Sequence, residues 1–274
     1  MVTRRKFAFA MASAGVGAGV GFERAARGAT AKDKGREIVD KTIAAMGGDA
    51  FRDMETRTEI GRAYSFYHER LSGLSIARLY TKYPPVENQP GPPQLHIEER
   101  QVLGKKQEDA VILTGTDGYE VTFRGARPLA EDRITQFRES TLHDFLYILR
   151  QRRNEPGLEF ESKGKDVTEN QPVETLDIYD SENRTVTVWI NSDTWLPVKQ
   201  RYYRWDPIIK DRREEVTRYT RYRESGHGVM WPHSTTRERD TEKIFEMYAD
   251  EVKVDTPLQN SMFELPRGIT ILSK

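Results

Sequence analysis

The sequence contains no cysteine, and this absence excludes several kinds of protein at once. Without cysteine the chain has no disulfide bond, no cysteine nucleophile and no lipidated cysteine that would make it a lipoprotein. In an oxidising compartment its fold would therefore depend on packing alone.

An excess of charge of one sign is also absent, since 43 Lys and Arg residues balance 43 Asp and Glu residues. Balanced charge gives no general attraction to nucleic acid. Two basic and aromatic stretches, RYYRW at 201–205 and RYTRYR at 218–223, could stack bases. Alternation on neighbouring strands equally produces cross-strand pairs of tyrosine and arginine on a half-exposed sheet. We interpret both stretches as sheet surface, with no nucleic-acid partner.

Motifs that carry catalytic chemistry are missing as well. The sequence has neither a G-x-S-x-G elbow nor the motifs of penicillin-binding proteins. His227 and His233 are six residues apart, but a metal site needs three or four converging ligands and no third one is evident nearby. Two further pairs, which we assign to the surface, are His96 with Glu98 and His143 with Asp144. The prediction is a protein that is not an enzyme and uses no cofactor and no metal.

A long apolar run is lacking, although the chain opens with a recognisable leader. TRRKF at 3–7 fits a twin-arginine signal, a weakly apolar stretch rich in Ala and Gly follows at 8–22, and Ala29, Thr30 and Ala31 form an A-x-A cleavage site. A membrane anchor would need roughly 20 apolar residues, and this run is shorter. We predict a signal peptide at 1–31, cleaved near Ala31, and a single periplasmic domain at 32–274 with no transmembrane anchor. Cleavage would remove five basic residues and one acidic residue and leave a mildly acidic domain.

Helical periodicity occurs at two places. Apolar residues recur at helical spacing over 34–46, and Gly47 and Gly48 follow as a stop signal. The second helix is predicted over 130–153. Its apolar face consists of Ile134, Phe137, Leu142, Phe145, Leu146 and Leu149.

The rest of the chain is dominated by strand patterns. Segments 56–71 and 74–83 predict a hairpin that turns at Ser72 and Gly73, and the proline-rich segment 84–93 predicts an exposed loop. Strand patterns separated by turn residues fill most of 158–254. About ten or eleven antiparallel strands with two helices predict an α+β fold, a curved sheet covered by helices on one face. A sheet of that size must curl or close.

Four segments together carry a family resemblance. They are AMGG at 45–48, VTVWINSDTWLPVKQ at 186–200, GVMWPH at 228–233 and PLQNSMFELP at 257–266, and the step W-I-N-x-x-T-x-L-P is the most specific of them. In this order they resemble the LolA-like outer-membrane lipoprotein carrier and sorting proteins, whose relatives include periplasmic sensors of the RseB type and mycobacterial lipid carriers. The resemblance implies an open, strongly curved antiparallel half-barrel whose concave apolar face lies under the N-terminal and mid-chain helices and receives acyl chains. It also implies an early arginine that closes the lid, for which Arg57 and Arg62 are both candidates.

The leading hypothesis is therefore a periplasmic protein that binds or carries lipid or lipoprotein without catalysis. Burial of an acyl chain stabilises a complex by roughly 0.8 kcal/mol per CH₂, so a dry trough needs no reactive residue. The expected trough residues are Ile178, Val188, Ile190, Tyr202 and Val216 on strands and Phe137, Phe145, Leu146 and Leu149 on the helix. The same residues could instead fill a closed core. Two other hypotheses stay open: a sensor or partner-binding protein with this fold, and an exported enzyme with an unrecognised site.

Overall fold

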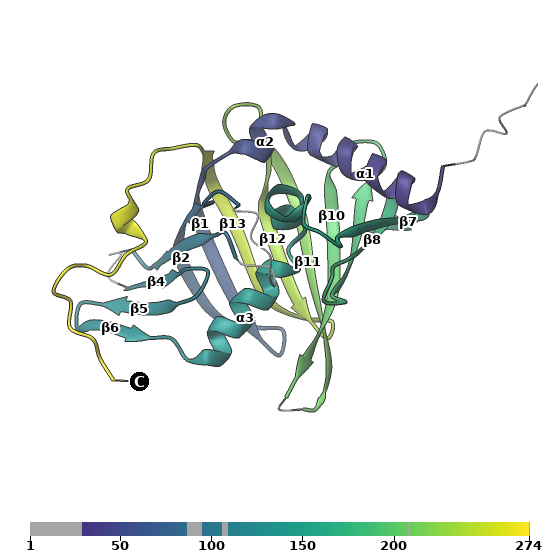
Figure 1. Cartoon of the computed structure of the whole chain (residues 1–274). Helices are drawn as coiled ribbons and strands as arrows, with labels where there is room; N and C mark the ends of the chain where they lie inside the picture. Colours follow the sequence, from purple (N-terminus) through teal and green to yellow (C-terminus); the bar gives the residue numbers. More distant parts are fainter. Residues whose placement is uncertain (1–28, 87–94, 106–108, 208, 274) are drawn as a thin grey trace, which may run out of the picture.

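A computed structural model describes residues 29–86, 95–105, 109–207 and 209–273. The twin-arginine motif, the apolar stretch at 8–22 and the prolines within 87–94 lie outside the described residues. The described chain folds into one sheet with helices on one of its faces (Figure 1).

The first helix, α1 (Ala31–Met46), begins at a capping box, in which Thr30 and Asp33 satisfy each other's free backbone amides. One face of α1 is buried against the sheet. Gly35 allows this close approach, because a Cβ there would lie 2.3 Å from the carbonyl oxygen of Phe160 on β7. The helix ends at Gly47, whose φ of 125° is a conformation that other residues avoid, and the short helix α2 (Asp49–Asp53) follows. The helix predicted over 34–46 is confirmed, with a start three residues earlier.

Thirteen strands form one antiparallel sheet in the order β6-β5-β4-β3-β2-β1-β13-β12-β11-β10-β9-β8-β7. Since β6 and β7 are its two edges, the sheet is open. The expected α+β class is confirmed, but the strand count corrects the expected ten or eleven. The strands are β1 (Thr56–Tyr67), β2 (Arg70–Lys82), β3 (Glu98–Leu103), β4 (Asp109–Leu113), β5 (Gly118–Thr122), β6 (Gly125–Pro128), β7 (Glu159–Thr168), β8 (Gln171–Tyr179), β9 (Thr185–Asn191), β10 (Pro197–Asp206), β11 (Asp211–Glu224), β12 (Met230–Arg239) and β13 (Glu242–Val254).

The first hairpin does not turn where its small residues predicted. The chain reverses at His68 and Glu69, both with positive φ, whereas Gly73 lies inside β2 opposite Ser65. The pairing is decided by the long ladder between β1 and β2, which outweighs the local preference of Ser72 and Gly73 for a turn.

The predicted mid-chain helix is present, but it is broken and is not the single continuous helix predicted over 130–153. It divides into α3 (Glu131–Leu142), the short α4 (Phe145–Tyr147) and a π-helical turn (Ile148–Arg152). At the break the backbone of Asp144 is extended, and its carboxylate accepts a hydrogen bond of 3.0 Å from the amide of Tyr147 as a new N-cap. A π-helical turn inside a helical segment is uncommon and frequently marks a functional region.

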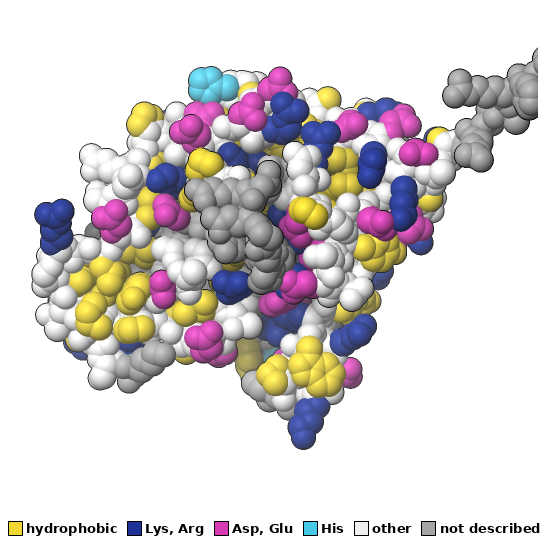
Figure 2. Space-filling model, viewed as in Figure 1, with side chains coloured by type: hydrophobic (Ala, Val, Ile, Leu, Met, Phe, Trp, Pro, Cys, Tyr) yellow, Lys and Arg dark blue, Asp and Glu magenta, His cyan; other side chains and the backbone are white. Residues whose placement is uncertain are grey.

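The main core lies between the helices and the covered face of the sheet. Ile38, Val39 and Met46 of α1 pack there with Phe145 and Leu149. The opposite face carries only small apolar clusters, such as Val173, Trp189 and Val198. In Figure 2, charged side chains are spread over the visible surface, which accounts for the polar composition of the chain.

The W-I-N-x-x-T-x-L-P step forms the tight connection between β9 and β10. The Asn191 side chain accepts hydrogen bonds from the amides of Asp193 (2.9 Å) and Thr194 (2.8 Å), and Trp195 follows with a positive φ of 58°. Lys41 of α1 lies 4.4 Å above the Trp195 ring. The most specific motif of the sequence thus builds a turn and joins it to the first helix.

Candidate functional site

Two adjoining cavities lie between α3 and the covered face of the sheet. We call the larger, of about 330 Å³, the apolar chamber and the smaller, of about 290 Å³, the polar chamber. Six residues line both and mark their junction: Gln101, Phe137, Ser140, Asp144, Thr217 and Arg237. The volume of each is near or within the ~300–1,000 Å³ typical of small-molecule sites.

The apolar chamber is walled mainly by carbon side chains. These come from β1, from strands on either side of it, from the residue that precedes β3 and from the broken helix. They are Ala63, Ala77, Leu79, Ile97, Leu103, Phe137, Leu146, Trp231, Phe245 and Met247. Arg57 also lines it, with an ion pair of 2.7 Å to Glu59 and its guanidinium carbon 4.3 Å above the Trp231 ring. Arg57 further donates a hydrogen bond to the Tyr83 hydroxyl. Its charge is therefore neutralised within the wall.

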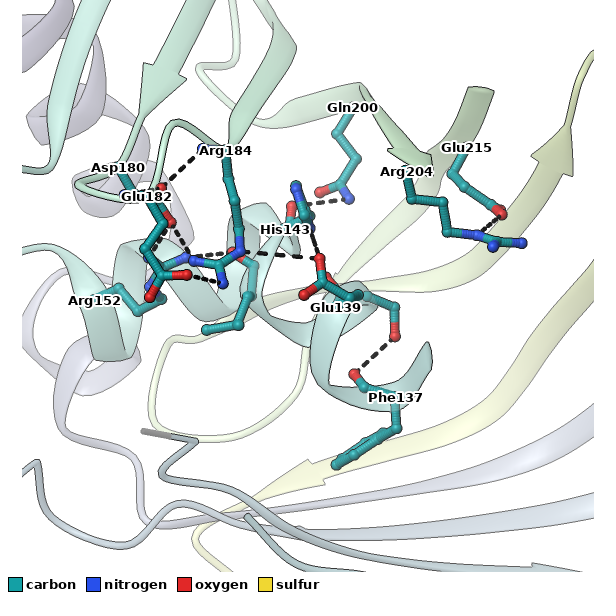
Figure 3. A network of polar contacts seen from close by, with 12 residues as sticks. Phe137, Glu139, His143, Arg152, Asp180, Glu182, Arg184, Gln200, Arg204 and Glu215 are labelled. Atoms are coloured by element: carbon teal, nitrogen blue, oxygen red, sulfur yellow. Dashed lines mark hydrogen bonds and ion pairs between the residues drawn. The ribbon is translucent and has the colours of Figure 1, made fainter. Parts of the chain in front are cut away.

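The polar chamber contains three arginines, Arg133, Arg237 and Arg239, and two carboxylates, Asp144 and Glu215. Glu215 is held by Arg239 at 2.7 Å and by Arg204 at 2.8 Å, and the latter contact is drawn in Figure 3. In Figure 2, basic and acidic side chains lie together in the hollow between α3 and the β10–β11 hairpin. The site is thus less uniformly apolar than the trough expected from the sequence.

Two carboxyl groups at the chambers have perturbed acidity. Burial raises the pKa of Glu99, against the hydrogen bond from Gln101 and the charges of Arg57 and Arg237, which lower it. Burial likewise raises the pKa of Asp144, against the amide of Tyr147 and the same two arginines. The ionised form of both groups is therefore disfavoured in the folded chain.

The raised pKa of Glu99 predicts a pH-dependent effect of the substitution Glu99→Gln. A carboxyl whose pKa is higher in the folded than in the unfolded chain destabilises the fold when it ionises. We expect Glu99→Gln to raise the free energy of unfolding at neutral pH, and the gain to vanish as the pH falls below the unfolded pKa. Urea unfolding across a pH series measures it.

The neighbouring residue provides the control for this substitution. Glu98 is half-exposed and lies 3.8 Å from the amino group of Lys82, so Glu98→Gln should give no such gain. Equal behaviour of the two variants at every pH would contradict the burial argument.

Gln200 of β10 fixes the break in the helix above the chambers. Its side-chain oxygen accepts hydrogen bonds of 2.7 Å from both the amide of Phe145 and the hydroxyl of Tyr219, and its nitrogen donates to the carbonyl of His143. The His143 ring stacks on Tyr202 with 4.2 Å between centroids. Gln200 was not predicted as a site residue, although its place two residues before the inward-facing Tyr202 on one strand was a sign that it faces inward. The prediction that His143 lies on the surface is wrong, because the residue is buried.

A buried ionic network holds the π-helical turn onto the sheet (Figure 3). Arg152 contacts Asp180 at 2.8 Å and both carboxylate oxygens of Glu155, and Arg184 contacts Asp180 at 3.0 Å. The side chains of Arg152 and Asp180 are only 4% and 2% exposed. This network positions the helical segment that roofs the site.

The residues predicted for the trough divide between the chambers and the core. Phe137 lines both chambers, Leu146 the apolar one and Tyr202 the polar one. The others predicted there belong to the packed core and line neither chamber: Ile178, Val188, Ile190, Phe145 and Leu149.

Val216 and the two candidate arginines differ in their positions relative to the chambers. Val216 borders the polar chamber, but it is paired with Arg201, on the opposite face from its neighbours Glu215 and Thr217. Alternation therefore directs its side chain away from the helices. Of the two early arginines, Arg57 lines the apolar chamber, whereas Arg62 is half exposed and pairs with Asp250 at 3.2 Å.

Two features are absent from the part of the chain that the structure describes. There, no group of three His, Cys, Asp or Glu side chains could hold a metal ion. Nor does any helix in those residues have the length and apolarity needed to cross a membrane.

Comparison with known proteins identifies the fold. No family model and no curated protein matches the chain. Among solved structures, a putative outer membrane lipoprotein-sorting protein domain from Vibrio parahaemolyticus is 13% identical, with a TM-score of 0.55, over 85% of this chain and 97% of that one. A DUF1329 family protein from Desulfovibrio piger is 11% identical, with a TM-score of 0.56, over 84% and 97%. The similarity predicted from four sequence segments is thus confirmed at the level of the fold.

Proposed function

We propose, from this lipoprotein-sorting fold and its apolar chamber, that the chain is a non-catalytic carrier that holds an acyl chain of a lipid or lipoprotein. The observation that carries the proposal is the chamber of about 330 Å³ under Phe137 and Leu146. Its floor of Ala63, Ala77 and Met247 offers an acyl chain apolar contact along its length. Each methylene buried there would contribute roughly 0.8 kcal/mol to binding.

The proposal treats the sheet as a strongly curved half-barrel whose concave face holds the helices. In this arrangement α3 and α4 roof the chambers, and Gln200 and the Arg152 network hold that roof in place. The core residues predicted for the trough, such as Ile190 and Leu149, then belong to the hydrophobic core and do not contact the acyl chain.

We further infer export by the twin-arginine pathway and action in the periplasm as one domain of residues 32–274. Cleavage after Ala31 would remove Thr30, the N-cap of α1. Loss of a capping side chain costs a helix about 1 kcal/mol. The contact of Lys32 with Glu159 at 2.7 Å would remain and tie the shortened helix to β7.

The proposal predicts that the protein carries lipid when it is purified from the periplasm of the cells that make it. Native mass spectrometry should detect an added mass of about one acyl lipid per chain, and extraction with organic solvent should remove it. Protein refolded from denaturant without lipid is the control, and it should regain the mass from a membrane lipid extract. A ligand-free protein that also fails to take up lipid after refolding would contradict the carrier function and favour a partner-binding role.

A further inference from the structure

Arg237 is an arginine on the covered face that forms no hydrogen bond or ion pair with the part of the chain that the structure describes. It lies on β12, lines both chambers and is exposed to solvent there. Among the described residues no hydrogen bond or ion pair involves its guanidinium group, whose carbon lies 5.8 Å from the Phe245 ring centre. Its neighbours on this face differ: Arg57 is paired with Glu59, and Arg239 with Glu215. The charge of Arg237 is therefore available to a ligand.

A second available cation faces the same chamber from the roof. Arg133 of α3 lines the polar chamber, and its side chain forms no hydrogen bond or ion pair with the described residues. Hydrogen-bonding side chains accompany the two arginines around the chamber: Gln101, Gln136, Ser140 and Thr217. Arginine recognises carboxylate and phosphate through paired, charge-assisted hydrogen bonds.

The carboxylates nearby form no ion pair with these two cations among the residues that the structure describes. Glu215 is already bound by Arg204 and Arg239. Asp144 accepts the amide hydrogen of Tyr147. Burial raises the pKa of Asp144 and of Glu99, and the charge of Arg237 acts on both carboxyl groups in the opposite direction.

We propose that Arg237, assisted by Arg133, binds the anionic headgroup of an amphiphile whose acyl chain occupies the apolar chamber. The inference rests on the proposed carrier function and adds the chemical class of the ligand. Arg237 lies at the junction of the chambers, so one molecule can place its chain on one side of it and its headgroup on the other. The shared chemistry of the headgroup is a carboxylate or a phosphate.

Binding of three twelve-carbon probes to the delipidated full chain tests this. The probes are dodecanoate, dodecyl phosphate and the uncharged glycerol ester of dodecanoic acid, measured by calorimetry below their micelle concentrations. At least one anionic probe should bind about tenfold more tightly than the ester, a difference of about 1.4 kcal/mol, because hydrogen bonds to charged groups are stronger than those between neutral groups. A preference between the two anionic probes identifies the headgroup as carboxylate or phosphate.

Substitutions assign that preference to the arginine. Arg237→Gln should abolish the preference for the anionic probe while leaving the affinity for the ester unchanged. Arg237→Lys should retain part of that preference. Arg62→Gln, on the opposite face, is the matched control and should change nothing. Equal binding of all three probes, with no effect of Arg237→Gln, would overturn the headgroup assignment but leave the carrier function standing. Failure of every probe to bind would overturn both.

Discussion

We expect Arg152→Met to lower the free energy of unfolding by about 3–5 kcal/mol, the range for removal of one partner from a buried ion pair. The Asp180 side chain is 2% exposed, so loss of Arg152 leaves a carboxylate that water cannot solvate. Among the described residues it would keep the ion pair with Arg184 and hydrogen bonds from the amides of Glu182 and Arg184. The Leu142 carbonyl also loses the hydrogen bond that Arg152 donates to it. Methionine keeps the apolar stem of the side chain, so the loss reports on the charge. Urea unfolding measures it.

The adjacent arginine is the matched control. Arg153 pairs with Asp40 at 2.7 Å, but these side chains are 32% and 61% exposed. Arg153→Met should cost no more than about 1 kcal/mol, as for other exposed ion pairs. Similar losses in the two variants would contradict a special role for the buried network.

The loss caused by Arg152→Met should depend on pH. Burial alone would raise the pKa of Asp180, but hydrogen bonds from Arg152 and Arg184 outweigh burial, and the pKa is lowered. A carboxyl with a lowered pKa stabilises the fold above its unfolded pKa, and this stabilisation disappears as the pH falls through its folded pKa. The difference in the free energy of unfolding between Arg152→Met and the unaltered chain should therefore become smaller at acid pH.

The sequence predicted correctly the first helix and the antiparallel sheet, because both depend on the local spacing of apolar residues. The helix at 34–46 follows from apolar spacing and from the glycines after it, and the antiparallel sheet follows from alternation between turns. The turn at Asn191 follows from one short motif. Each depends on residues within a few positions of one another.

The polar half of the site depends on contacts between distant parts of the chain. Arg57, Glu99 and Arg237 occupy inward positions on three strands, where alternation alone suggests exposed charge. The register between β1 and β13 joins residues 180 to 197 positions apart, from Ser65 with Phe245 to Arg57 with Val254. The break at His143 likewise depends on a glutamine 57 positions later. Such pairings are set by tertiary packing, so a single sequence does not contain a local sign of them.

Filling the apolar chamber should weaken acyl-chain binding strongly while the protein stays folded. Ala63 lies on the inward face of β1 opposite Met247, and both residues line the chamber. The variant Ala63→Trp would put a large ring where the ligand chain is proposed to lie. Displacing four methylenes from the chamber would cost about 3 kcal/mol at roughly 0.8 kcal/mol each, which weakens binding about a hundredfold.

The same substitution outside the chamber separates occlusion from a general effect of tryptophan. Ala44 is exposed on α1 and lines neither chamber, so Ala44→Trp should bind dodecanoate like the unaltered chain. A second filling variant, Ala77→Phe on the adjacent strand, should repeat the loss if Ala63→Trp proves unstable. Phe137 of α3 and Leu146 of α4 bound the chamber, so both helices must stay folded for this comparison to apply. A urea unfolding transition like that of the unaltered chain tests whether the variant is folded. Undiminished binding by a folded Ala63→Trp would place the acyl chain elsewhere in the protein.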